Sequence, residues 1–133
     1  MTGQEIFDLA VALLGEADNG ECANYDLEGF EKSAVGILNV LGVSLDGLDC
    51  TLKRQRPDAD NHRYMWIGSL KDPVPLHPVL CRSLLPLGLC YYFLLEENAA
   101  RATHFLRAFE SQKAAVEKRF PGVRRHGIRN VYQ

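Results

Sequence analysis

The longest apolar run of the chain, Leu84 to Leu95, constrains the fold more than any other feature of the sequence. Crossing a bilayer takes about 20 apolar residues, so this run is too short to span a membrane. A helix that is apolar nearly all round is instead buried by its neighbours. We therefore predict a central helix over about residues 78–96. The helix should be kinked where the ring of Pro86 clashes with the carbonyl of Arg82.

The residues around this helix predict how it begins and what it buries. Prolines between Asp72 and Pro78 exclude a helix interior there, because proline lacks an N–H donor and restricts the residue before it. Pro78 suits the first turn of the central helix. Four side chains of the helix should be buried by the helices around it: Leu85, Leu89, Tyr92 and Phe93.

Capping residues and apolar stripes predict helices before the central one. Thr2 and Glu5 form a capping-box pattern ahead of apolar residues at helical spacing, which predicts a helix over about residues 3–15. Asn24 and Asp26 are both candidate caps for a second helix. Gly42 is the residue expected to end that helix, and Ser44 is a candidate cap for a further short turn through Leu45 and Leu48.

After the central helix, Asn98 is expected to cap a last helix of about residues 99–120, which Pro121 and Gly122 end. Residues 53–62 are a polar loop. Residues 63–70 are ambiguous, since Tyr64, Trp66 and Gly68 would share one face of a short strand that has no obvious partner. The predicted fold is all-α, a four- to five-helix bundle with a kinked central helix. Its helical domain covers residues 1–122, and residues 123–133 form an extended basic C-terminal tail.

The cysteine pattern does not predict disulfides, and the N-terminal residues do not resemble a secretory signal. The four cysteines form no C-x-x-C pair and no zinc-like spacing with histidine, so reduced thiols are expected. Cys81 and Cys90 should behave as small buried hydrophobes. Spacing alone does not determine connectivity, so a disulfide stays an alternative. No basic region precedes the first apolar residues, unlike a secretory signal, and we expect no membrane association.

The net charge of −2 hides a split between the two halves of the chain. Residues 1–60 hold twelve acidic and four basic residues, a net of −8, whereas residues 61–133 hold eleven basic and five acidic residues, a net of +6. Such asymmetry is typical of proteins with an electrostatic partner. The alternative is that both halves are solvated helical faces of one domain.

No motif for catalysis or metal binding is evident in the sequence. The four histidines are scattered, and Glu96 and Glu97 are adjacent, so they do not face each other on a helix. No phosphate-binding glycine loop or nucleophile motif is present. We therefore expect a protein that is not an enzyme and that uses no cofactor, metal ion or small-molecule substrate.

Two basic clusters hint at nucleic-acid binding. One joins Lys53, Arg54 and Arg56 to the nearby aromatics Tyr64 and Trp66, and the other lies in the tail. Basic clusters interleaved with aromatics can bind a phosphate backbone and stack on bases. However, the isoelectric point near 6.1 does not fit a dedicated binder, so a solvated loop and a docking tail are the preferred interpretation.

Several segments resemble one family. Gln4–Leu14 resembles the opening helix of small structural proteins from the morphogenesis clusters of tailed phages and prophages of Gram-positive bacteria. Ala34–Leu41 is a second match, and the strongest runs from Leu84 to Phe109. There the family pattern is a helix through Leu-Pro-Tyr-Gly-Leu, an acidic-Asn break and an aromatic-rich last helix. The end of the chain, Asn130 to Gln133, resembles the common ending Asp-Val-Tyr-Gly.

Two departures accompany this resemblance, which covers about two-thirds of the chain. Leu87 stands where the pattern has an aromatic residue, and residues 44–72 match poorly. The resemblance implies a head–tail connector (adaptor) protein. Such proteins are helical, form a homo-oligomeric ring under the portal, extend the DNA channel towards the tail and carry no catalytic residues.

For this chain the resemblance implies contacts with the portal protein and with tail-side connector proteins, and passage of DNA without specific recognition. The protein would lie in the virion and, during assembly, in the bacterial host cytoplasm. The candidate residues for docking to a neighbouring subunit or to the portal are Arg124, Arg125, Arg129 and Tyr132. The main alternative is a prophage-encoded helical regulatory or DNA-associated protein that uses the basic tail. A small helical enzyme subunit is a more distant alternative.

Overall fold

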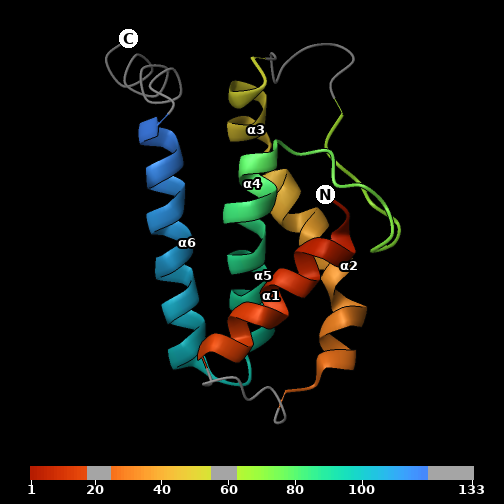
Figure 1. Cartoon of the computed structure of the whole chain (residues 1–133), viewed down its shortest axis with the longest axis vertical. Coiled ribbons are helices and arrows are strands. Elements are labelled where there is room, and N and C mark those ends of the chain that lie inside the picture. Colours follow the sequence, from red (N-terminus) through yellow and green to blue (C-terminus); the bar gives the residue numbers. More distant parts are fainter. Residues whose placement is uncertain (18–24, 55–62, 120–133) are drawn as a thin grey trace.

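The computed structural model describes residues 1–17, 25–54 and 63–119, and these residues form an all-α fold (Figure 1). No β-strand is present in the described ranges, where only an isolated bridge joins Thr2 to Pro73. The prediction of an all-α protein is confirmed. The helices are α1 (Gly3–Ala17), α2 (Leu27–Ser44), α3 (Asp46–Leu52), α4 (Pro78–Ser83), α5 (Leu85–Leu94) and α6 (Ala99–Arg119).

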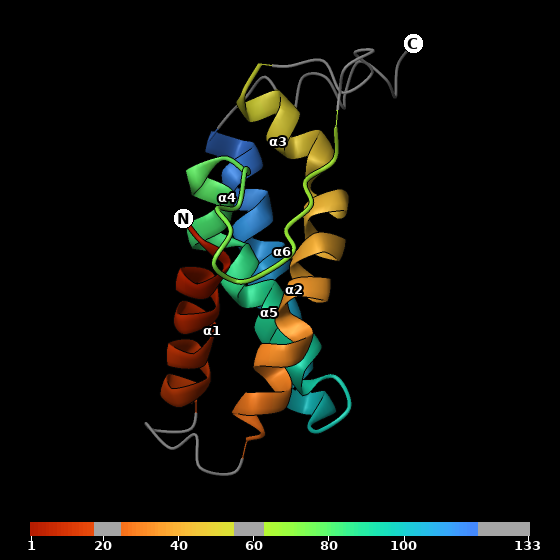
Figure 2. The ribbon, with the colours of Figure 1, turned by 90° about the vertical axis from the view of Figure 1, so that its right-hand side faces the viewer.

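Helix α5 lies at the centre and packs against α1, α2, α4 and α6 (Figures 1 and 2). The predicted burial of Leu85, Leu89 and Phe93 is confirmed, and the Phe93 ring stacks on Phe30 with ring centroids 4.5 Å apart. The prediction for Tyr92 is wrong. Its side chain is 38% exposed, because the helices packed on α5 leave it partly uncovered.

The apolar segment is two helices that break at Leu84. Pro86 occupies the first turn of α5, where its missing N–H would not have been bonded within the helix. A continuous helix would need that N–H as a donor to Arg82, so the chain restarts its helix at the proline. Pro78 begins α4 as expected, and His77 Nδ1 accepts a hydrogen bond of 3.2 Å from the N–H of Val79.

Helix α1 begins where predicted and ends two residues later than expected, at Ala17. The Thr2 hydroxyl accepts from the Glu5 N–H at 3.2 Å, as a capping box requires. The Glu5 carboxylate accepts from the Thr2 hydroxyl, not from its amide, at 3.4 Å. The Gly3 and Gln4 N–H groups donate to the carbonyls of Asp72 and Leu70 at 3.1 and 2.7 Å. A distant segment therefore completes this helix start.

Helix α2 is capped by Asp26, whose carboxylate accepts from the Gly29 N–H at 3.0 Å. The prediction that Gly42 ends this helix is wrong, since α2 continues to Ser44. Gly42 instead makes room for the Met65 side chain, which occupies the space that a Cβ atom would take. The predicted Ser44 cap is also wrong, because its hydroxyl donates back to the Leu41 carbonyl at 2.9 Å.

In the ambiguous segment 63–70, residues 63–67 join no sheet and residues 68–70 begin a turn. Its alternation is as expected for one strand: Tyr64 and Trp66 are exposed, whereas Met65 and Ile67 are buried. The backbone of Ile67 is paired with the side chain of Asn39, whose Nδ2 donates to the Ile67 carbonyl at 3.0 Å and whose Oδ1 accepts from the Ile67 N–H at 2.9 Å. The buried side-chain amide of Asn39 thus makes the two hydrogen bonds that a neighbouring strand would otherwise make with Ile67.

Helix α6 starts after Asn98, whose side chain accepts from the Arg101 N–H at 3.2 Å, as predicted. It packs on α5 through Ala102, Phe105 and Val116, which are buried. No single helix in the described ranges is long and apolar enough to cross a membrane. Helices α2 and α3, which meet at a bend of 62°, satisfy that test by length and composition only when they are taken together.

Candidate docking surfaces

The docking residues predicted from the sequence, Arg124, Arg125, Arg129 and Tyr132, lie outside the described residues. The same is true of Arg56 in the first basic cluster. The described surface nevertheless contains three regions of distinct chemistry: an aromatic edge beside α2, a groove between α1 and α2, and the outer face of α6.

The aromatic edge consists of Val40, Val43, Tyr64 and Trp66. Their exposed fractions are 56%, 51%, 60% and 78%. Two contacts place the segment that carries Tyr64 and Trp66 beside α2, because Ile67 is bonded to Asn39 and Met65 covers Gly42. The backbone of residues 64–67 therefore runs beside the second half of α2, and the alternate side chains point to solvent. The two aromatic residues were evident in the sequence, whereas the exposure of the two valines was not.

The water-facing side of α2 beside this edge is uncharged. A surface helix typically presents charged residues to solvent. From residue 33 to residue 47, however, no exposed side chain of α2 or of the start of α3 is charged. The exposed residues are Ser33, Gly36, Val40, Val43, Ser44 and Gly47. The scarcity of charged residues in this stretch is visible in the sequence. Only the structure shows which of its positions are exposed.

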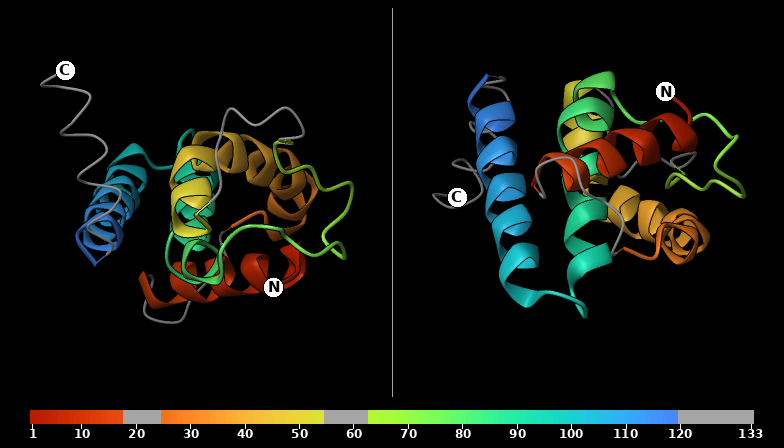
Figure 3. Two further views of the ribbon diagram at one scale, coloured as in Figure 1. Left: turned by 90° about the horizontal axis from the view of Figure 1, so that it is seen from above. Right: turned by 60° about the horizontal axis from the view of Figure 1, so that its bottom comes forward.

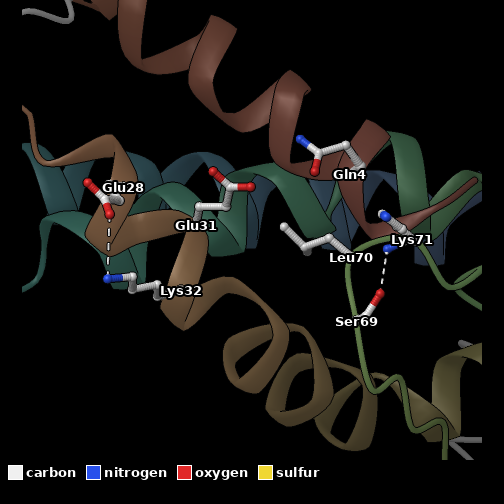
Figure 4. A pocket seen from close by; sticks show the side chains of 7 residues that line it. All are labelled: Gln4, Glu28, Glu31, Lys32, Ser69, Leu70 and Lys71. Carbon is white, nitrogen blue, oxygen red and sulfur yellow. Dashed lines mark hydrogen bonds and ion pairs between the residues drawn. The ribbon is translucent and has the colours of Figure 1, made fainter.

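The groove between α1 and α2 is open and has a volume of about 430 Å³. Figure 4 shows its lining, with Gln4 on one side, Glu28, Glu31 and Lys32 on the other, and the turn at Ser69 to Lys71 closing one end. Glu28 pairs with Lys32 at 3.5 Å, whereas the Glu31 side chain points into the groove. The Glu31 carboxylate thus lies in an open groove that Lys32 and Lys71 also line.

Helix α6 lies at the opposite side of the molecule from the aromatic edge. Figure 1 and both views of Figure 3 place α6 on one side of α5 and the segment that follows residue 63 on the other. The helix holds five basic and two acidic residues, a net of +3. Its exposed charges are Arg107, Glu110, Lys118 and Arg119, and the small residues Ser111, Ala114 and Ala115 are exposed between them.

The first basic cluster is only partly available for binding. Lys53 Nζ lies 2.9 Å from the Asp49 carboxylate and donates to the Pro75 carbonyl. The ammonium group is therefore already paired within the chain. Asp49 also accepts from the His77 N–H at 2.7 Å. These bonds attach α3 to the start of α4. Lys53 therefore has a structural role, which leaves the nucleic-acid hint weaker than the sequence suggested.

The three described cysteines, Cys50, Cys81 and Cys90, are buried and are not joined in disulfides. Burial raises the pKa of all three, that of Cys90 to about 12, and the carboxylates of Asp46 and Asp49 add to the effect at Cys50. Thiols held protonated are poor nucleophiles. The expectation that Cys81 and Cys90 act as small buried hydrophobes is confirmed.

Within the described residues no group of three or more His, Cys, Asp or Glu side chains converges as a metal site would.

The fold and these surfaces together define an all-α protein whose exposed chemistry is divided between opposite sides. Comparisons of the chain with protein-family models, with curated proteins and with solved structures find no match.

Proposed function

We propose that this chain is a structural protein of a tailed phage or prophage, a head–tail connector that forms a ring at the portal–tail junction. The supporting observation is the position of the aromatic edge and of basic α6 on opposite sides of the molecule. A cyclic ring is built by a heterologous interface, in which one face of a subunit meets a different face of the next. In a ring of many copies, these two faces point in nearly opposite directions.

The positions of the family-like segments also support the proposal. Residues 4–14 lie in α1, and residues 84–109 cover α5 and the first half of α6. These helices pack on one another, because α5 contacts both α1 and α6. The resemblance therefore falls on the packed centre of the chain. The poorly matching residues 44–72 contain α3 and the aromatic part of the edge, where a partner-specific surface would vary.

In this proposal the helices form a bundle around the broken central helix, and the tail 123–133 is a docking arm. Arg124, Arg125, Arg129 and Tyr132 contact the portal protein or a neighbouring copy. Tail-side connector proteins bind the other side of the ring, and DNA passes through it without specific recognition. The protein then belongs to the virion and, before assembly is complete, to the host cytoplasm.

The decisive experiment is a pull-down with the portal protein encoded in the same gene cluster, at low and at high salt. We expect the portal to retain the full-length chain at low salt and less of it at high salt, because exposed ion pairs are screened by salt. Removing residues 123–133 should weaken retention. Failure of the portal to retain the full-length chain at either salt concentration would exclude the connector function.

The alternative is a regulatory or DNA-associated protein, and the exposure of Tyr64 and Trp66 favours it, since exposed aromatic rings can stack on bases. The same pull-down separates the two functions when duplex and single-stranded DNA are included as baits. If the chain does not bind the portal but binds DNA in a salt-dependent way, it is the regulatory or DNA-associated protein. A chain that binds the portal and neither form of DNA is the connector.

A further inference from the structure

We propose that, in the assembled protein, the outer face of α6 of one copy covers the aromatic edge of the next copy. This inference rests on the proposed ring and specifies its subunit interface, for which the resemblance supplies no residues. The occupant is a second copy of this chain, and the contact lies on described residues at both surfaces.

The aromatic edge has the character of a surface that is buried in an assembly. Tryptophan and tyrosine each remove a large area from water when they are covered, and both are enriched at protein interfaces. The edge exposes one of each beside two valines, on a helix side that carries no charge from residue 33 to residue 47. Large apolar side chains that are exposed near one another on a subunit are typical of a contact surface, although the cation Arg63 adjoins Tyr64.

The outer face of α6 has the complementary character. Ser111, Ala114 and Ala115 are small and exposed, so the backbone of α6 can approach the large Trp66 ring closely. Arg107 and Lys118 flank these residues, and a cation over an indole or phenol face is attracted by the ring. The face therefore offers a shallow surface for the rings and cations at both of its ends.

The spacing of charges agrees with this arrangement. Arg107 and Lys118 are eleven residues apart on α6, which corresponds to about 16 Å along the helix. On the facing copy, Trp66 lies beside the part of α2 between Asn39 and Gly42, whereas Glu31 lies about 14 Å nearer the start of α2. One cation of α6 can thus lie over Trp66 while the other pairs with Glu31.

The positions of the aromatic edge and α6 mean that the proposed contact must join two different copies. The aromatic edge and α6 lie on opposite sides of α5, so α6 cannot reach the edge of its own chain (Figures 1 and 3). The pairing is also heterologous, with a different surface on each partner, and repeats of such a contact close into rings. A self-pairing of two aromatic edges would instead give dimers.

Site-specific cross-linking tests the contact directly in the assembled state. A copy carrying Val43→Cys is mixed with a copy carrying Ala115→Cys, both in a Cys22→Ser background, and assembly is induced at high protein concentration or on the portal. A short thiol cross-linker should join the two different copies. Cross-links between two Val43→Cys copies, or none in an assembly, would overturn the proposed contact.

Charge reversal gives a second test that does not depend on a cross-linker. Glu31→Lys, and separately Arg107→Glu with Lys118→Glu, should each weaken self-association by at least tenfold, and combining them should restore part of the loss. Trp66→Ala should weaken it without rescue. Arg82→Glu, an exposed charge reversal on α4, is the matched control and should have little effect. Circular dichroism confirms that each variant is folded.

The outcomes separate this inference from the proposed function. If several copies bind the portal but no Val43→Cys to Ala115→Cys cross-link forms, the interface is wrong and the connector stands. If the chain neither binds the portal nor associates with itself, both fail. Burial of Trp66 by anionic lipid vesicles, measured as a fluorescence blue shift that Arg107→Glu does not alter, would overturn the interface and identify a membrane surface.

Discussion

At the scale of single residues, one buried amide decides how an extended segment is held. Asn39 is only 7% exposed, and its side chain bonds both backbone groups of Ile67. Buried backbone groups must be paired, because leaving them without partners costs the free energy of their desolvation. Asn39 therefore specifies which part of the segment after residue 63 faces α2, and with it where Tyr64 and Trp66 are displayed.

Replacing Asn39 by leucine should lower the free energy of unfolding by about 2–4 kcal/mol, since two buried groups of Ile67 lose their partner. The measurement is equilibrium urea denaturation. Ser33→Ala, an exposed position on the same helix, is the control and should change stability by less than about 0.5 kcal/mol. A destabilisation by Asn39→Leu no larger than that of the control would show that the amide does not hold the segment.

Gly42 and Gly36 lie in the same helix, yet their surroundings predict opposite effects of substitution. A Cβ atom at Gly42 would collide with Cγ and Sδ of the buried Met65, whereas nothing lies within 4 Å of a Cβ atom at Gly36. Gly42→Ala should therefore destabilise the protein by about 1–3 kcal/mol through overpacking. Gly36→Ala should stabilise it by about 0.5–1 kcal/mol, because alanine favours a helix.

Thermal unfolding of the two variants checks this pair of predictions. Adding Met65→Ala to Gly42→Ala should remove the collision, so the double variant should be more stable than the sum of the two single effects. Equal shifts in melting temperature for Gly36→Ala and Gly42→Ala would contradict the packing of Met65 over α2.

At the scale of elements, the start of α1 depends on a turn nearly seventy residues away. Asp72 Oδ2 accepts from the N–H groups of Gly68 and Ser69 at 2.8 and 3.1 Å, and this fixes the turn whose carbonyls cap α1. The first four N–H groups of a helix have no partner within it. Here Gly3 and Gln4 donate to the turn, whereas Glu5 and Ile6 donate to Thr2.

Asp72→Ala should loosen the turn and expose the first amides of α1 to exchange with solvent. We expect hydrogen exchange of Gly3 and Gln4 to become at least tenfold faster, with a loss of about 1 kcal/mol in global stability. Asp26→Ala is the matched control, because it removes the cap of α2 and should speed exchange at Gly29 instead. Unchanged protection of Gly3 and Gln4 in Asp72→Ala would contradict the role of the turn.

At the scale of the whole molecule, the charge split is only partly a surface property. Asp46 and Asp49 belong to the acidic half but are buried, and Asp49 binds Lys53 and the His77 N–H within the fold. In the second half, α6 carries a net of +3. Fewer acidic groups are thus available to a partner than the sequence count suggests, and Glu31, in the open groove between α1 and α2, is one that stays exposed.

The buried thiols give a measure of how well the whole core is closed. In a Cys22→Ser variant, a thiol reagent at pH 8 should label Cys50, Cys81 and Cys90 slowly. They are almost inaccessible, and their raised pKa values keep them protonated. All three should react fully in urea. Rapid labelling of the folded protein, read by mass spectrometry, would indicate that the core opens without global unfolding.

Local patterns in the sequence determined which parts of the chain are helical. Caps at Thr2, Asp26 and Asn98, prolines at 78 and 86 and apolar spacing act over one or two turns, so they can be read from neighbouring residues. The aromatic edge was visible only in part, because alternation at Tyr64 and Trp66 identifies a face but not what lies beside it. The docking residues of the tail stay predictions, since they lie outside the described residues.

Only the tertiary structure decided the features that depend on residues far apart in sequence. Gly42 reads as a helix end, yet contact with Met65 makes it a packing position in a longer helix. Asn39 pairs with Ile67 across 28 positions, a contact that its neighbours in the sequence do not reveal. Tyr92 reads as core, yet it is partly exposed. A sequence encodes local propensities directly, whereas burial and long-range pairing follow from how helices pack, and this packing placed the aromatic edge and α6 on opposite sides.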